Sequence, residues 1–340
     1  MKKRIVLSGY YGFKNFGDEA ILSVLIKKLQ QDKNIITVIS SNPEYTKSLH
    51  SNIRAVKTFD FQKIIGSIYK SDILISGGGS LLQDVTSLKS LIYYLLIIFI
   101  GLFLRKNVII FAQGIGPINS PIGQFFTKAL LRNCSYVSVR DSKSYDLMNR
   151  WGIKSDLLCD PIFSVEVPEK KKGETLAVQL RNCKGLNMDF LDRLADGVCR
   201  NFKDYKIEIY SFQDSIDLEI CQTFEQKLKI LAPEINITLY SDLTNTQIIE
   251  NISSAQYLIS MRFHAIIIGL LAKTKTLAIN YDIKVEKLAK EFGIPTIDLK
   301  KEFNNQFELL KNQNLAEIYT KISTQDFNWD NFENAINQHR

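Results

Sequence analysis

The sequence predicts an α/β protein built from two Rossmann-like, doubly wound domains that face a cleft. Short runs rich in β-branched residues alternate with helical stretches, which is typical of a parallel sheet with helices on both faces. Glycines and polar residues repeatedly follow the predicted strands, and the pattern restarts after a polar stretch at 165–174 that contains Pro168. At 340 residues, the chain is also longer than one hydrophobic core usually serves.

Both predicted domains show this alternation. In residues 1–168, the predicted strands are 5–8, 35–40, 72–76, 108–112, 136–139 and 157–159, and the first helix is 18–29. In residues 169–340, the predicted strands are 175–180, 207–212, 237–240, 257–261 and 276–279, and the predicted helices are 189–202, 216–231, 246–253, 265–272 and 284–292. The polar tail after Lys300 is partly helical in pattern, and crossing back onto the first domain is one course open to it.

Composition indicates a folded globular protein, with 45% hydrophobic and 23% charged residues. The net charge of +7 favours anionic substrates or lipid surfaces mildly, and is too weak and too dispersed to indicate nucleic acid. The five cysteines lack C-x-x-C spacing, which favours free thiols in a reducing cytoplasm. We expect a cytoplasmic protein without a signal peptide, a metal or a cofactor, because neither an adequate apolar leader nor a set of residues with metal-ligand spacing is legible.

An uncharged apolar run covers residues 90–104, between Lys89 and Arg105. As a helix it would reach about 22 Å, short of the ~30 Å hydrocarbon core of a bilayer. Two interpretations stay open. The run is a helix buried against the sheet, or it is an interfacial helix resting on the cytoplasmic face of the membrane, flanked by Lys89, Arg105 and Lys106.

Glycine-rich loops follow two predicted strands. Residues 9–18 join the first strand to the first helix, where glycine N–H groups and a helix N-terminus can meet a phosphate. The loop matches neither a P-loop nor a dinucleotide fingerprint, and the plain alternative is a tight turn capped by Asp18. A second glycine run at the same predicted sheet edge favours a shared pocket. The predicted acceptor- and phosphate-binding residues are Gly12, Asn15, Gly17, Asp18, Gly77, Gly78 and Gly79.

The most informative stretch is Arg262-Phe263-His264, at a strand-to-helix junction where parallel α/β folds place ligands. Only His264, of the three histidines, stands at such a junction. Lys284 follows twenty residues later, and Arg140 ends another predicted strand, with a surface pair to Asp141 or Asp146 as its alternative role. A proton donor beside fixed positive charge suits an anionic substrate that must be protonated.

Five stretches in this order resemble the polysaccharide pyruvyl transferase family, in its branch that modifies bacterial cell-wall polymers. They are SGYYGFKNFGDEAIL at 8–22, DILISGGGSLLQD at 72–84, FAQGIGPI at 111–118, VSVRDSKS at 137–144 and SMRFHAIIIGL at 260–270. The resemblance implies a GT-B-like fold with an acceptor-binding first domain and a donor-binding second domain. It also implies transfer of a carboxyethylidene group from phosphoenolpyruvate onto two sugar hydroxyls as a cyclic ketal.

The resemblance assigns phosphoenolpyruvate binding to Arg140, Arg262 and Lys284, the last by spacing. It implies a saccharide acceptor, often linked to a polyprenyl diphosphate, that meets the N-terminal glycine loop. We expect His264 to be the general acid, with phosphate binding alone as its other role. Asp18 and Asp84 are candidates for the base by position only.

Two other functions stay open. A GT-B-like glycosyltransferase would share the fold but would need a base-and-ribose pocket for a nucleotide sugar. A non-catalytic saccharide or lipid-phosphate binding protein would keep the glycine loops, but nothing in it would require the arginine, histidine and lysine together.

Overall fold

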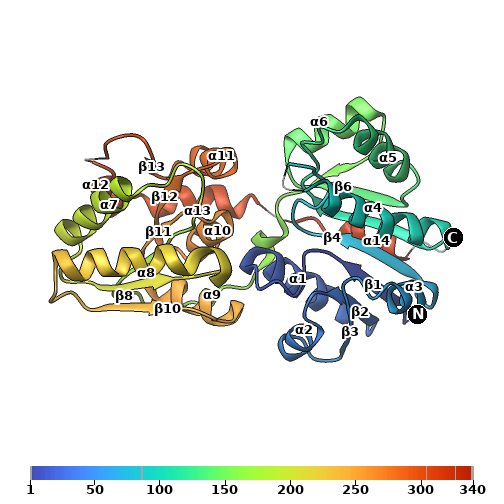
Figure 1. Cartoon of the computed structure of the whole chain (residues 1–340), viewed down its shortest axis with the longest axis horizontal. Coiled ribbons are helices and arrows are strands. Elements are labelled where there is room, and N and C mark those ends of the chain that lie inside the picture. Colours follow the sequence, from blue (N-terminus) through green and yellow to red (C-terminus); the bar gives the residue numbers. More distant parts are fainter. Residues whose placement is uncertain (1, 86, 304, 326, 338–340) are drawn as a thin grey trace. The chain divides into compact units, whose positions relative to one another are not determined.

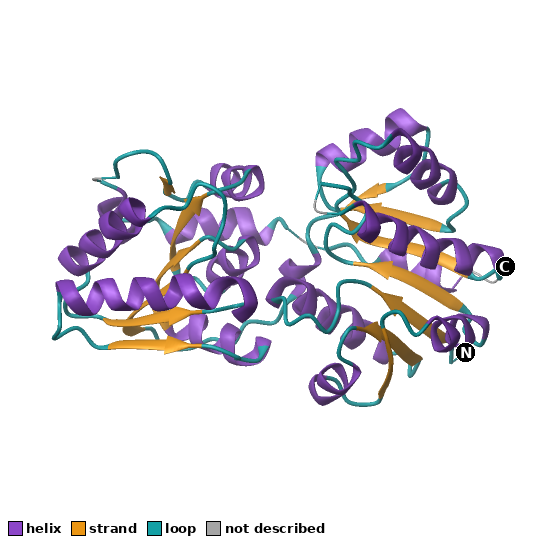
Figure 2. Cartoon of the chain, in the orientation of Figure 1, coloured by secondary structure: helices purple, strands orange, loops and turns teal. Residues whose placement is uncertain are grey.

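The computed structural model describes residues 2–85, 87–303, 305–325 and 327–337. The chain forms two compact units, which we call unit 1 (Met1–Ser164 with Asp326–Arg340) and unit 2 (Val165–Gln325) (Figure 1). The division falls after residue 164, where the sequence placed it after 168, and the end of the chain belongs to unit 1. Each unit holds one parallel sheet with interleaved helices (Figure 2). The predicted α/β class is therefore confirmed.

Unit 1 contains a seven-stranded sheet in the order β3-β2-β1-β4-β5-β6-β7. Its strands are β1 (Arg4–Ser8), β2 (Ile35–Ser40), β3 (Ile53–Lys57), β4 (Ile73–Gly77), β5 (Asn107–Gln113), β6 (Tyr136–Val139) and β7 (Asp156–Leu157). Its helices are α1 (Phe16–Gln30), α2 (Pro43–Leu49), α3 (Phe61–Tyr69), α4 (Leu88–Phe103), α5 (Pro121–Leu131), α6 (Ser142–Trp151), a 3₁₀ turn (Pro161–Ser164) and α14 (Asp330–Asn337).

Successive strand residues point to opposite faces of this sheet, so it has a core on each side. Val6, Leu74 and Val108 pack with residues of α3, α4, α5 and α6. Ile5 and Ile75, on the other face, pack with residues of α1 and α14. The apolar run at 90–104 is thus a helix with one side in the core of unit 1, because Leu91, Tyr94, Leu95, Ile97, Ile98 and Gly101 are buried.

Helix α14 returns the end of the chain to unit 1. The ring of Phe332 is fully buried and lies 4.7 Å from that of Phe111 on β5, and Trp329 stacks on Phe111 at 5.6 Å. The side-chain amide of Asn107 donates to the carbonyl of Ala335 at 2.8 Å. This helix therefore completes one core of unit 1 with residues that are distant in sequence.

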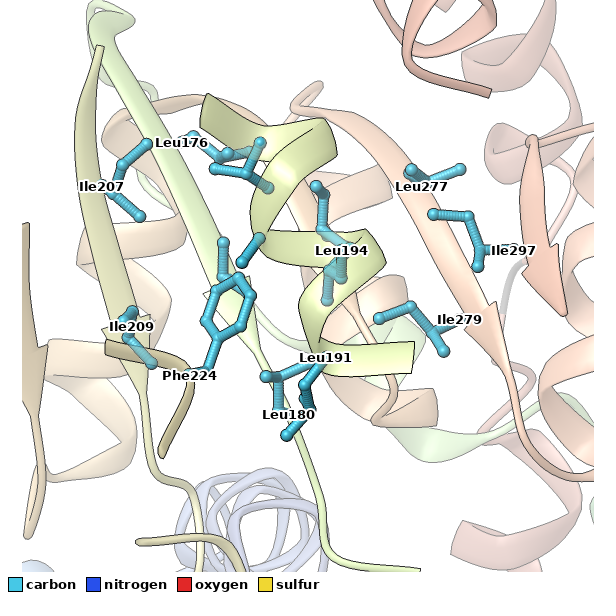
Figure 3. Close-up of a cluster of buried hydrophobic side chains, with 14 of the residues drawn as sticks. Leu176, Leu180, Leu191, Leu194, Ile207, Ile209, Phe224, Leu277, Ile279 and Ile297 are labelled. Carbon is cyan, nitrogen blue, oxygen red and sulfur yellow. The ribbon is translucent and has the colours of Figure 1, made fainter. Parts of the chain in front are cut away.

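Unit 2 contains a six-stranded sheet in the order β10-β9-β8-β11-β12-β13. Its strands are β8 (Gly173–Gln179), β9 (Lys206–Tyr210), β10 (Ile237–Tyr240), β11 (Ala255–Ser260), β12 (Lys275–Asn280) and β13 (Thr296–Asp298). Its helices are α7 (Met188–Asn201), α8 (Asp214–Leu231), α9 (Asn245–Ser254), α10 (Phe263–Leu271), α11 (Ile283–Phe292), α12 (Gln306–Lys311) and α13 (Leu315–Ser323). Figure 3 shows part of its core, in which Leu191 and Leu194 of α7 and Phe224 of α8 pack over Ile207, Ile279 and other strand residues.

Three differences from the predicted elements have simple causes. Strand β3 was missed because it is a half-exposed edge strand that carries Arg54 and Lys57. Strand β13 has only three residues after Pro295, too few for a periodic signal. Strand β8 begins at Gly173, inside the predicted linker, since a polar strand end resembles a loop in sequence.

We expect Phe332→Ala to destabilise unit 1 by about 3–5 kcal/mol, because it empties a fully buried ring site. Phe125→Ala makes the same chemical change at a side chain that is 68% exposed, and should cost far less. Both tryptophans, Trp151 and Trp329, belong to unit 1, so tryptophan fluorescence during guanidinium unfolding reports on this unit. Equal midpoints for the two variants would show that α14 does not support the core of unit 1.

Candidate functional site

Each sheet places its first strand in the middle, beside the strand that starts the second half of the unit. These neighbours are β1 and β4 in unit 1, and β8 and β11 in unit 2. The chain winds outward in opposite directions from each pair, which makes these positions topological switch points. Open α/β sheets bind ligands at such points, beyond the carboxyl ends of the strands. The loops after these four strands are therefore the candidate site regions, one in each unit.

The loop after β1 is held by its own helix. The N–H of Gly12 donates to Glu19 Oε1 at 2.7 Å, and Asn15 Oδ1 accepts from the N–H of Gly17 at 3.2 Å as the N-cap of α1. Gly12 has φ +79°, and a Cβ there would lie 2.6 Å from the backbone nitrogen of Asn42. Gly12 and Asn15 thus serve the conformation of this loop.

Glu19 is a buried carboxyl group under this loop, and the sequence did not single it out. Burial raises the pKa of Glu19 to about 7; the Gly12 N–H opposes this shift, and nearby Asp18 adds to it. Near neutral pH the group therefore exchanges its proton while it holds the glycine loop.

The loop after β4 presses against the first turn of α1. Gly78 and Gly79 have φ +72° and +67°, and a Cβ on Gly79 would lie 2.5 Å from Asp18 Oδ1. The Gly78 N–H donates to the carbonyl of Phe111 at 3.1 Å, and the Gly77 carbonyl accepts from the Tyr11 hydroxyl at 2.8 Å. Asp18 thus lies where the loops after β1 and β4 meet, as the sequence predicted for one shared edge.

Three of the backbone N–H groups in these glycine loops have acceptors within unit 1. The N–H groups of Gly12, Gly17 and Gly78 are donated to Glu19, Asn15 and Phe111, respectively. A phosphate bound at this edge would therefore need other donors than these three N–H groups. Aromatic side chains offer a different contact, since Tyr10 and Phe13 stack at 4.1 Å with an interplanar angle of 6°. Such a flat apolar surface can pack against the C–H face of a sugar ring.

Arg140 follows β6 and is largely buried. Its Nη1 bonds Asp160 Oδ2 at 2.5 Å, and its Nη2 donates to Ser80 Oγ at 3.2 Å, directly after the glycines of β4. Arg140 therefore bonds Asp160 and Ser80 instead of the alternative partners, Asp141 and Asp146. Asp160 is the carboxylate that positions Arg140.

Arg262 ends β11 in unit 2 and is held by a buried carboxylate. Its Nε donates to Asp217 Oδ2 at 3.2 Å, and its Nη2 lies 2.8 and 2.7 Å from the two oxygens of Asp217. Burial raises the pKa of Asp217, while the charge of Arg262 opposes that shift. The backbone N–H of Arg262 is fixed as well, by Gln179 at 2.9 Å and Ser260 at 3.0 Å.

His264 is the second residue of α10, at the predicted strand-to-helix junction. The side chain is half-buried, its Nε2 is buried, and its ring meets that of Phe263 edge-on at 5.3 Å. The side chain of Arg262, the residue before α10, bonds Asp217 instead of capping the helix. The N-terminus of α10 therefore adds partial positive charge to this position.

Arg181 is a further cation at this edge that sequence reasoning missed. Its N–H donates to Met261 Sδ at 3.2 Å, which joins the ends of β8 and β11. Burial raises the pKa of the Tyr281 hydroxyl, whereas Arg181, which hydrogen-bonds that hydroxyl, and Arg262 lower it. Arg181 therefore lies at the switch point of unit 2 with Arg262 and Tyr281. It follows its strand as Arg140 does, so the same rule would have found it.

Lys284 is exposed in the first turn of α11, which begins after β12. Its backbone N–H donates to Asp282 Oδ1, the N-cap of α11, at 2.7 Å. Strand β12 pairs with β11 in parallel, so both helices begin at the same edge of the sheet. Unit 2 thus carries Arg181, Arg262, His264 and Lys284 at one edge, whereas Arg140 belongs to unit 1.

Asp84, one candidate base, has a structural role. Its carboxylate accepts N–H bonds from Asn119 at 2.8 and 2.9 Å and from Ser120 at 2.7 Å, and these bonds lower the pKa of Asp84. Asp18 is therefore the stronger candidate for the general base.

The described residues lack two features, a metal-binding cluster and a membrane-spanning helix. Residues 2–85, 87–303, 305–325 and 327–337 contain no group of three or more His, Cys, Asp or Glu side chains that could hold a metal ion. Across the same ranges, no helix combines the length and apolar character needed to cross a membrane.

We expect Glu19→Gln to remove a pH dependence from the stability of unit 1. The stabilisation by the protonated carboxyl is fully present below pH ~4.5 and is lost as pH rises through about 7, because the folded state holds the proton more tightly. The unfolding free energy of the wild type, relative to Glu19→Gln, should fall by about 2–3 kcal/mol across that range. Glutamine keeps an oxygen for the Gly12 N–H. Glu44→Gln, at an exposed carboxylate, is the control. A constant difference across this range would refute the raised pKa.

Comparison with known proteins identifies the family and the fold. A family model described as polysaccharide pyruvyl transferase matches residues 15–283, and no curated protein is significantly similar in sequence. The structure is similar to the MnaA–UDP complex of S. aureus, with 11% identity, a TM-score of 0.65, and coverage of 99% of this chain and 95% of that one. A glycosyltransferase from Rickettsia africae is similar over 100% of both chains, with 12% identity and a TM-score of 0.63.

A third similar structure is the UDP-GlcNAc 2-epimerase from Neisseria meningitidis bound to UDP-GlcNAc, with 10% identity, a TM-score of 0.61 and 94% coverage of each chain. Identities this low establish the fold alone, which is the predicted GT-B-like arrangement of two Rossmann-like domains. The family model covers most of the chain, and its match includes the loops around Asp18, Arg140 and His264. The chain therefore belongs to the polysaccharide pyruvyl transferase family and is a transferase whose family implies a saccharide acceptor.

Proposed function

We propose that this protein transfers a pyruvyl group from phosphoenolpyruvate to two hydroxyls of a cell-surface polysaccharide precursor. The product is a cyclic ketal, and phosphate is released. The observation that carries this proposal is the Arg262-Phe263-His264 junction at the switch point of unit 2, in a chain of this family. Phosphoenolpyruvate carries roughly three negative charges near neutral pH, and this edge of unit 2 offers several cations.

We assign the donor to Arg140, Arg262 and Lys284, and we add Arg181. Asp217 bonds Nε and Nη2 of Arg262, so the donor contact would be to Nη1. Asp160 and Ser80 position Arg140 in the same manner. Because arginine forks bind oxyanions in fixed directions, these positioned guanidinium groups suit a carboxylate and a phosphate.

His264 acts as the general acid in this proposal. It gives a proton to the methylene carbon of phosphoenolpyruvate, which becomes a methyl group and leaves the oxygen-bearing carbon oxocarbenium-like. One sugar hydroxyl bonds to that carbon and loses its proton to a base. The carbon–oxygen bond to phosphate then breaks, and phosphate leaves with the proton that the base took up. The second hydroxyl closes the ketal, and its proton restores His264.

Unit 1 would hold the acceptor. Stacked Tyr10 and Phe13 offer a surface for a sugar ring, and Asp18, where the loops after β1 and β4 meet, is the base that we propose. The other predicted acceptor-binding residues would then shape the loops that surround the sugar. They are Gly12, Asn15, Gly17, Gly77, Gly78 and Gly79. We expect the acceptor saccharide to be linked to a lipid diphosphate, as the family resemblance implies.

The first experiment is phosphate release from phosphoenolpyruvate by the purified protein, with a panel of saccharides linked to lipid diphosphates or nucleotides. We expect release that depends on the acceptor, and a product mass gain that matches a pyruvate ketal. His264→Ala should lower kcat about 10²–10⁴-fold, which is the usual contribution of a general acid. Isothermal titration of phosphoenolpyruvate should show that this variant still binds the donor.

The outcomes of this assay separate the candidate functions. Wild-type turnover that persists in His264→Ala would overturn the assignment of the acid. Binding of saccharide without turnover with any donor would favour a binding protein instead.

A nucleotide-sugar glycosyltransferase is the second candidate, because similar structures hold UDP or UDP-GlcNAc. The same acceptor panel, incubated with UDP-sugars, would release UDP if this function is correct. Failure of phosphoenolpyruvate to bind, together with UDP release, would replace the pyruvyl transfer proposal with this one.

We expect Arg181→Gln to weaken phosphoenolpyruvate binding about 10–100-fold, since it removes one charge-assisted contact to the donor. Isothermal titration measures this change directly. Arg200→Gln, at a side chain that pairs with Asp196 on the surface of α7, is the matched control and should bind as the wild type does. If Arg181→Gln binds phosphoenolpyruvate with wild-type affinity, then Arg181 does not contact the donor, and its role is the hydrogen bond with Tyr281.

A further inference from the structure

Helices α4 and α5 of unit 1 expose a continuous set of large apolar side chains. Phe103, Ile122 and Phe125 are 73%, 70% and 68% exposed, and the other members of the set are 39–56% exposed. The two helices pack together, and a Cβ on Gly123 would lie 3.1 Å from Leu91 Cδ2. We call this set the outer face. It consists of Leu88, Ile92, Leu96, Phe99 and Phe103 of α4, and Ile122, Phe125 and Phe126 of α5.

The outer face reverses the usual pattern of a surface helix. Members of α4 recur at intervals of three or four residues, so they form one stripe along the whole helix. The opposite side of α4 packs on the sheet, where a Cβ on Gly101 would lie 2.5 Å from Leu74 Cδ2. Polar residues normally cover the solvent side of such a helix. A hollow of about 380 Å³ between the C-terminal ends of α4 and α5 is lined by Phe99 and Phe103 of this stripe, together with Leu102, Leu130 and the polar Asn133.

Within the segment that carries the outer face, the charged residues are all basic, and the nearby carboxylate of Asp84 is bound to the N–H groups of Asn119 and Ser120. From residue 85 to 140 the sequence contains no Asp or Glu, but it contains Lys89, Arg105, Lys106, Lys128, Arg132 and Arg140. Arg140 is bound to Asp160 inside the unit. The other five stand at the ends of α4 and α5: Lys89 in the first turn of α4, Arg105 and Lys106 after its end, and Lys128 and Arg132 at the end of α5. Lys89 and Arg105 are exposed.

We infer that the outer face docks this protein on the surface of an anionic lipid bilayer, with α4 and α5 lying in the interface. Aromatic and aliphatic side chains would enter the headgroup region, and the basic residues at the helix ends would meet lipid phosphates. Long basic side chains beside an apolar helix suit this arrangement. A second copy of the chain is less suited to this surface, because it would bring the same unbalanced positive charge against it.

This inference rests on unit 1 alone and is independent of the donor. It also gives the acceptor region a membrane context. Helix α4 begins after the loop that follows β4, and Tyr94 lies on the buried side of this helix. Burial raises the pKa of Tyr94, and the charge of Asp18 raises it further, so α4 passes close to the acceptor loop. A saccharide with a lipid anchor would thus reach Asp18 from the bilayer that holds the outer face.

The test is co-sedimentation of the full chain with vesicles in 0.1 M salt. One set contains phosphatidylglycerol and phosphatidylcholine, and the other contains phosphatidylcholine alone. We expect the wild type to bind the anionic vesicles and to lose affinity as salt is raised. The double variant Phe99→Glu/Phe103→Glu should bind about 100-fold more weakly, since two exposed rings no longer enter the interface. Arg105→Gln should lower binding about fivefold and keep the apolar stripe intact.

The matched control is Met188→Glu/Ile230→Glu, which adds the same charges at exposed apolar side chains of unit 2. It should bind vesicles as the wild type does, and circular dichroism should show that every variant is folded. Wild type that fails to bind anionic vesicles, or equal loss in both double variants, would overturn the inference. Sedimentation velocity provides the remaining outcome: a wild-type dimer that Phe99→Glu/Phe103→Glu dissociates would assign the outer face to a second copy.

Discussion

The buried ion pair between Asp217 and Arg262 is the interaction on which the site of unit 2 depends. Asp217 is fully buried in the first turns of α8, and Arg262 stands between β11 and α10. A buried charge is stable only with a partner, and removal of one member of such a pair typically costs about 3–5 kcal/mol. The pair therefore fixes the end of β11, and through it the start of α10 and the place of His264. Gln179 reinforces this from β8 by accepting the N–H of Arg262.

In unit 1, buried ionisable groups are also stabilised, in two different ways. Arg140 is matched by Asp160, in a pair that joins the end of β6 to the segment after β7. Glu19 is stabilised instead by protonation and by the N–H of Gly12. Both arrangements place polar groups at the carboxyl edge of a sheet without an unbalanced charge in the interior.

The sequence predicted the strands that are apolar and buried, the helix faces that pack on them, and the junction that carries His264. These features have a local signal, because a strand, its terminal polar residue and the next helix are contiguous. The pairing of charges has no such signal. Asp217 lies 45 residues before Arg262, and Asp160 lies 20 residues after Arg140. The pairs exist because the topology brings separate elements to one edge. The exposed side of α4 could not be predicted for a related reason. A helix that is apolar all round does not show in its sequence which side packs on the sheet.

The matching of charges also narrows how a trianionic donor could be bound. Arg140 and Arg262 are each opposed by a buried carboxylate, so they supply direction and hydrogen bonds more than net charge. For the proposed donor, phosphoenolpyruvate, the surplus positive charge would then come from Arg181, Lys284 and the N-terminus of α10 at His264. Recognition of the donor and its protonation would thus involve neighbouring residues at one edge of the sheet of unit 2.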